Sequence, residues 1–101
     1  GVQTCALPIW SLTADDVVHV HVNDAPAGVD VGDQVDNVRA LPSETGVIDL
    51  VGFLKVLAEI GYEGPVTPEP FSKRVRELPA EEAVKETGGG LDKAWQAAGL
   101  K

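Results

Sequence analysis

Positive charge, cysteine and long apolar runs are all scarce in this sequence of 101 residues. Lysine and arginine total 8 against 16 acids, a net charge of −8, which argues against binding to a nucleic-acid backbone because such binding needs clusters of basic residues. No apolar run approaches the roughly 20 residues of a membrane span, and no basic region precedes an apolar one as in a signal peptide. The single cysteine cannot form an internal disulfide, so we expect a reducing, cytoplasmic location.

The N-terminal residues do not resemble natural protein sequence. Residues 1–9 are GVQTCALPI, which is similar throughout, in one reading frame, to the translation of a common sequencing adapter. Technical sequence of this kind is set aside before fold reasoning. We therefore expect residues 1–10 to be an artefactual leader, and residues 11–101 to be a natural segment from the C-terminal part of a longer protein.

The first predicted element is a strand over residues 17–22, whose sequence VVHVHV is β-branched apart from two histidines. Apolar residues on both faces indicate a strand covered on both sides, as in a parallel sheet. The alternation places Val18, Val20 and Val22 on one face, and Val17, His19 and His21 on the other. A long loop over residues 23–46, rich in glycine and proline, is predicted to follow.

A helix is predicted after this loop. Asp49 is a good N-cap, apolar residues recur at helical spacing behind it, and Gly61 stands where a glycine cap ends a helix. Residues 65–69 then predict a short second strand, nearly finished at Pro68 because proline cannot donate to a sheet ladder.

A last helix is predicted to open at Pro79 and to continue to Gly99. Gly88–Gly90 interrupt its apolar stripe, so we expect one weakened helix that can break there. The order strand, helix, strand, helix indicates an α/β fold with parallel strands joined by a right-handed crossover. Two strands and two helices cannot close a barrel, which also favours a fragment.

Two chemically capable side chains come at the ends of the predicted strands. His21 ends the first and Glu69 ends the second, and the carboxyl ends of parallel strands meet at one edge of a sheet. An imidazole nitrogen and a carboxylate oxygen are both good ligands for a divalent transition metal. His19 lies on the same face, deeper along the strand. The alternative is that both histidines are satisfied interior residues and Glu69 is an exposed strand-end acid.

Four short motifs occur in order along the chain: HVHVND (19–24), GVIDL (46–50), GYEGPV (61–66) and EPF (69–71). Together they resemble the last quarter of the xylose isomerase-like TIM-barrel family, over roughly residues 16–100. That family includes sugar and sugar-phosphate isomerases and epimerases, inosose dehydratases and type IV apurinic endonucleases. The resemblance implies that the chain is the C-terminal part of a (β/α)8 barrel, strands seven and eight with their helices, and that the barrel is incomplete here.

The resemblance also implies roles for individual residues. His21 looks like the family's metal-binding histidine, and Glu69 like a second metal ligand that shuttles a proton in the epimerases. Arg39 resembles a substrate-binding arginine, although its loop is longer than in many members, and a solvated loop residue is the alternative. Asp24 is expected to support His21 or the loop. Two further ligands, a glutamate and an aspartate, come from earlier strands that this chain lacks, so we expect the chain alone to bind metal poorly and to be inactive.

The function implied is that of a sugar or sugar-phosphate isomerase or epimerase. It would depend on Mn²⁺, Mg²⁺, Co²⁺ or Zn²⁺ and move a proton through a metal-stabilised enediolate. An inosose dehydratase-type lyase and a small non-catalytic binding or structural protein are the alternatives. The expected partner is a small sugar, with no nucleic acid and no membrane, and a homo-oligomer is left open. The acidic charge disfavours a DNA-repair endonuclease.

Overall fold

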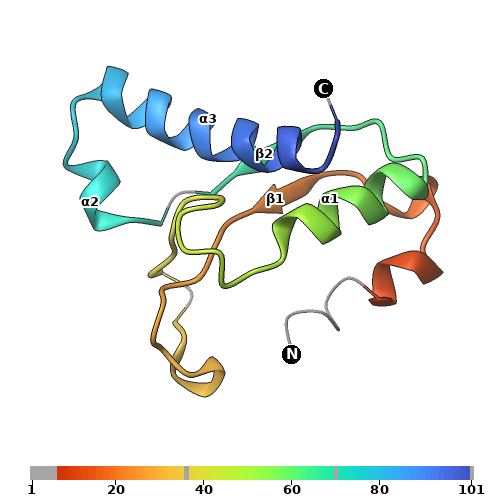
Figure 1. The fold of residues 1–101 in the computed structure, drawn as a ribbon, viewed down its shortest axis with the longest axis horizontal. Helices are drawn as coiled ribbons and strands as arrows, with labels where there is room; N and C mark the ends of the chain where they lie inside the picture. The colour runs from red at the N-terminus through yellow and green to blue at the C-terminus, as the bar shows by residue number, and fades with distance from the viewer. Residues whose placement is uncertain (1–6, 36, 70, 101) are drawn as a thin grey trace.

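Two short parallel strands organise the chain. The computed structural model describes residues 7–35, 37–69 and 71–100 (Figure 1). Strand β1 (Val20–Val22) pairs with β2 (Val66–Pro68) in the register Val20↔Val66, His21↔Thr67 and Val22↔Pro68. The predicted order of a parallel strand pair with a helix between and a helix after is therefore present.

Two helices pack on one face of this sheet. Helix α1 (Leu50–Glu59) contacts α3 (Ala80–Ala97), and α3 also contacts β2. The core that they form with β1 consists of Val20, Val22, Leu50, Leu54, Leu57, Ala94 and Ala98. Because side chains alternate along a strand, the valines of β1 point into this core while His21 points to the opposite, exposed face. One sheet face is thus apolar and covered, and the other carries the polar side chains.

The prediction for the first strand is partly wrong. Regular pairing starts at Val20, which lies opposite Val66, the first residue of β2, and the preceding 3-10 turn (η3, Ala14–Asp16) ends at Val17. The alternation is broken there: Val18 is 88% exposed, whereas Val17 packs against the core. The expectation of cover on both faces is also wrong for the described residues, since the side of the sheet that carries His21 is exposed.

Helix α1 begins and ends where the sequence predicts. The Asp49 side chain accepts a hydrogen bond from the Gly52 N–H at 3.0 Å, which caps the first turn. At the other end, Gly61 has a φ of +83°, and the N–H of Tyr62 donates to the Leu57 carbonyl at 3.1 Å. This is a Schellman-type ending, which needs a residue in the left-handed region and explains the glycine.

Helix α3 runs unbroken through Gly88–Gly90. A four-residue helix that the sequence did not predict, α2 (Lys73–Arg76), precedes it. Figure 1 shows α2 and the long loop that follows β1 at the same end of the molecule, the end to which the strands point. That loop contains one further 3-10 turn, η4 (Val31–Asp33).

The expected leader, residues 1–10, lies partly outside the described residues. Leu7–Ser11 form a 3-10 helix (η2), in which Ile9 packs against the core and the Trp10 indole donates to the Glu59 carboxylate at 2.8 Å. Within the described ranges, no helix combines the length and apolarity needed to cross a membrane.

Candidate functional site

The structure brings His21 and Glu69 together at the ends of the two strands. The His21 Nδ1 atom lies 3.3 Å from Glu69 Oε2, and the side chains are 52% and 42% exposed. His21 pairs with Thr67 of β2, and Glu69 follows two residues later, just past the end of β2, with its side chain on the same side of the sheet as His21. An imidazole and a carboxylate therefore lie side by side within reach of a small molecule.

A side-chain hydrogen bond fixes the backbone of Glu69. The Glu69 N–H donates to the Asn23 Oδ1 atom at 3.0 Å. The preceding residue, Pro68, has no N–H, so the regular ladder cannot continue through it. The Asn23 amide thus joins the strand ends just past the proline and sets the position from which the Glu69 side chain extends. The sequence did not single out this role of Asn23.

Two more polar side chains continue along the same exposed face. The His19 Nε2 atom lies 3.1 Å from the Thr67 hydroxyl oxygen. The His19 ring meets the His21 ring edge-on, with centroids 4.7 Å apart and planes at 86°. The two histidine rings therefore restrict each other's orientation. His19 lies two residues before His21, further from the strand end, as predicted.

Arg39 reaches the same end of the sheet through its backbone. The Arg39 N–H donates to the carbonyl of Phe71 at 2.8 Å, two residues beyond Glu69. The next residue, Ala40, pairs with Asp24 in an antiparallel bridge. The long loop after β1 thus returns to the strand ends at Arg39, which lies between the segments that follow the two strands.

Asp24 is buried and its carboxylate is fully engaged. The side chain is 1% exposed. Its Oδ1 accepts hydrogen bonds from the N–H groups of Ala25 at 2.9 Å and Ile48 at 3.0 Å, and its Oδ2 from Thr45 at 3.1 Å and Gly46 at 2.7 Å. Burial acts to raise the pKa of Asp24, but the four backbone donors outweigh it and hold the pKa below its usual value. Asp24 supports the loop, in agreement with the sequence expectation.

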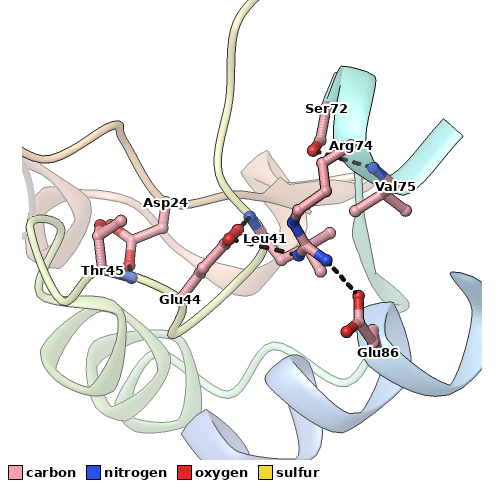
Figure 2. Close-up of polar contacts among 8 residues, drawn as sticks. All are labelled: Asp24, Leu41, Glu44, Thr45, Ser72, Arg74, Val75 and Glu86. Carbon is pink, nitrogen blue, oxygen red and sulfur yellow. Dashed lines mark hydrogen bonds and ion pairs between the residues drawn. The ribbon is translucent and has the colours of Figure 1, made fainter. Parts of the chain in front are cut away.

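A second polar cluster lies on the outside of the same loop. Arg74 of α2 contacts Glu44 of the loop at 3.3 Å and Glu86 of α3 at 2.8 Å, and Figure 2 shows its guanidinium directed toward both carboxylates. The hydrogen bond that Arg74 donates to Glu86 is the main cause that raises the pKa of Arg74. Glu44 also accepts from the Leu41 N–H at 2.8 Å. No sequence pattern predicts this cluster, because its members come from three separate segments.

The strand-end pair fits part of a divalent-metal site. Imidazole nitrogen and carboxylate oxygen suit Zn²⁺, Co²⁺ or Mn²⁺, and both side chains are accessible. Within the described ranges, no group of three or more His, Cys, Asp or Glu side chains could hold a metal ion. A complete site at this position therefore needs donors from beyond these residues.

One comparison with known proteins finds a match. The family model described as "Xylose isomerase-like TIM barrel" matches residues 6–93. The matched segment contains both strands, the long loop and most of α3. No curated protein and no solved structure matches the chain.

Proposed function

The chain belongs to the xylose isomerase-like TIM-barrel family, and from this we propose that it forms the last two strand–helix pairs of a barrel enzyme that isomerises or epimerises a sugar or sugar phosphate. The observation that carries the proposal is the pairing of His21 with Glu69, 3.3 Å apart on the exposed face at the strand ends. In barrels, residues at this end of the strands surround the substrate.

Glu69 is the residue that moves a proton. Its carboxylate and a second carboxylate from outside this chain remove a proton from the substrate carbon beside the carbonyl and return one, to the neighbouring carbon in an isomerisation or to the opposite face of the same carbon in an epimerisation. A divalent cation held by His21, Glu69 and donors from outside this chain would polarise the substrate carbonyl and make that proton more acidic. A carboxylate has two oxygens, so Glu69 can serve both purposes.

Arg39 is proposed to bind the substrate. Its backbone is held at the strand ends by the Phe71 carbonyl, and its guanidinium suits a phosphate or a sugar hydroxyl. The Asn23 side chain keeps Glu69 in place, and His19 limits the rotation of the His21 ring.

A metal titration tests the pair directly. We expect Mn²⁺ to bind the chain weakly and to broaden the NMR signals of residues near positions 21 and 69. His21→Ala and Glu69→Gln should each remove most of this broadening. The matched control is Glu63→Gln, an exposed carboxylate that precedes β2 and lies at its other end. Broadening that survives both site variants, or that centres on another acidic segment, would remove the pair from the metal site.

An activity test addresses the reaction. An independent read of the source DNA before Ser11 should reveal codons for further strand–helix units, with a glutamate and an aspartate ending two strands. The longer protein should then interconvert an aldose and a ketose, or two epimers, with Mn²⁺, and Glu69→Gln should abolish turnover without unfolding it. An inosose in the substrate panel tests the dehydratase alternative. A Glu69→Gln protein with near-normal turnover would contradict the proposed mechanism.

A further inference from the structure

The geometry of Asp24 points to a second role besides its support of the loop. Among the residues that the structure describes, it is the one charged side chain that is buried, and its two oxygens accept four backbone hydrogen bonds. A carboxylate has about four acceptor positions, so these bonds use its full capacity. Asp24 is therefore not placed to bind a metal or to move a proton, and its effect on chemistry must pass through the groups it holds.

Asp24 holds Ala40, the residue that directly follows Arg39 in the chain. The backbone of Asp24 exchanges two hydrogen bonds with Ala40, both 3.0 Å long, while its carboxylate binds the turn at residues 45–48. Both ends of the segment 40–48 are thus fastened to one residue, and Arg39 is the last residue before that segment.

From this arrangement we propose that Asp24 is a positioning residue that holds Arg39 at the substrate-binding end of the sheet. The proposal rests on the proposed function, in which Arg39 binds the substrate. Asp24 acts from one side through Ala40, and the Phe71 carbonyl holds the Arg39 N–H from the other side at 2.8 Å.

The outer contacts of the loop do not replace Asp24. Glu44 pairs with Arg74 at the surface, where both side chains are substantially exposed, and such pairs contribute little because water screens them (Figure 2). The Asp24 bonds are buried and charge-assisted, and a buried N–H left without a partner is costly. Loss of the carboxylate should therefore free the loop even with the surface pairs intact.

Replacing the Asp24 carboxylate by an amide removes specific hydrogen bonds and leaves the shape of the side chain almost unchanged. In Asp24→Asn, one acceptor oxygen becomes an NH₂ group that faces backbone N–H donors, so two of the four bonds are lost with almost no change in shape. The matched control is Asp49→Asn, which makes the same change at a carboxylate whose backbone contact is the Gly52 N–H of α1.

Amide hydrogen exchange on the chain itself decides whether Asp24 positions Arg39. We expect the Arg39 and Ala40 amides to exchange at least about tenfold faster in Asp24→Asn, while the Leu54 amide in the core of α1 keeps its rate. Asp49→Asn should leave Arg39 and Ala40 unchanged. Unchanged exchange at Arg39 in Asp24→Asn, or equal acceleration throughout the protein, would overturn the proposal.

A milder variant covers the case in which Asp24→Asn does not fold. The Thr45 hydroxyl donates to the Ala25 carbonyl at 2.6 Å and so fastens the same turn from an exposed position. Thr45→Val should accelerate exchange at Arg39 and Ala40 by a smaller factor, again without changing Leu54. No acceleration at these two amides would count against the proposal.

Binding of a probe tests the link to Arg39. With D-fructose 6-phosphate as the probe, Asp24→Asn should raise Kd about tenfold, in line with the loss of one or two buried hydrogen bonds. In an Arg39→Ala background, Asp24→Asn should raise Kd no further, because the residue through which it acts is gone. Additive effects would overturn the proposal. The binding test uses the longer protein proposed above, in which the substrate site is complete. If that protein does not bind the probe, the role of Arg39 in the proposed function fails, and the exchange experiment alone decides its positioning.

Discussion

At the scale of single residues, the polar side chains near the strand ends divide into two groups. His21 and Glu69 are exposed and lie close enough to act on the same small molecule. Asn23 and Asp24 instead bind backbone N–H groups, so that their oxygens are used in fixing the chain. Neighbouring positions in the motif HVHVND thus differ, since the His21 side chain is exposed whereas those of Asn23 and Asp24 fix the backbone.

The pH dependence of stability should report on Asp24. Because its pKa in the folded protein is lower than the usual 3.8, the ionised form favours folding, and this contribution is fully present above pH 3.8 and lost as the pH falls through the folded pKa. At pH 7 we expect Asp24→Asn to lower the free energy of unfolding by roughly 2–3 kcal/mol. The difference in the free energy of unfolding between the unaltered protein and Asp24→Asn should become smaller as the pH falls below about 3.8.

Urea denaturation of both proteins between pH 7 and pH 2.5 measures this gap. The comparison cancels the titration of the other carboxylates, which both proteins share. A gap that stays constant over the whole range would show that the ionised carboxylate is not the form that stabilises the fold.

The sequence predicted that His21 and Glu69 lie close together better than it predicted the contacts of Asp24. A strand end can be located from β-branched residues and a following proline, and parallel strands bring their ends together. Three of the four amides that the Asp24 carboxylate binds lie more than twenty residues away, across an irregular loop with no repeating pattern. The expectation that Asp24 supports the loop was correct, but which amides it binds could not be predicted.

At the scale of elements, α3 is the one whose sequence conflicts most with its structure. Three consecutive glycines lie inside a continuous helix of 18 residues. A Cβ atom at Gly88 or Gly89 would meet nothing within 4 Å, whereas one at Gly90 would clash with the Pro42 carbonyl oxygen. Gly90 thus permits the loop and the helix to approach each other, and the other two glycines have no such contact.

Alanine substitutions should separate these positions. Gly88→Ala and Gly89→Ala should each raise the free energy of unfolding by about 0.5–1 kcal/mol, because alanine loses less backbone entropy in a helix. Gly90→Ala should lower it by about 1–3 kcal/mol, since the loop must move away. Thermal or urea denaturation gives the values, and a stabilising Gly90→Ala would contradict the close approach.

Element boundaries were predictable where a local signal exists. Asp49 and Gly61 cap α1 as expected, because capping depends on residues within one turn. The start of β1 was not predictable, because the run of β-branched residues begins at Val17 and carries no signal that pairing starts only at Val20. Helix α2 was missed because four residues carry no periodicity that a sequence can show.

At the scale of the whole molecule, the distribution of polarity and charge is uneven. One sheet face is covered by α1 and α3, while the other presents His19, His21 and Glu69. The chain carries a net charge of −8. Most of the acids that contribute to it lie on the surface, where they repel one another in the compact state.

Added salt should stabilise the protein. Salt weakens the surface pairs that Arg74 makes, but exposed pairs contribute little, whereas it also screens the repulsion from the net charge of −8. We expect the free energy of unfolding to rise by up to about 1 kcal/mol between 10 mM and 300 mM NaCl. Urea denaturation at the two concentrations measures the change. A fall would mean that the ion pairs outweigh the repulsion, and Arg74→Ala should then abolish the salt effect.

The bonds of Asp24 also bear on the order in which the chain can fold. Asp24 and Ile48 are 24 residues apart, and this interval lies inside the 46 residues that separate Asn23 from Glu69. Closing a loop costs about 0.6 kcal/mol more entropy for each doubling of its length. If the shorter loop closes first, about half of the longer interval is already spanned when the strands meet. The buried carboxylate would then shorten the conformational search for strand pairing by about threefold, so its loss would slow folding as well as hasten unfolding.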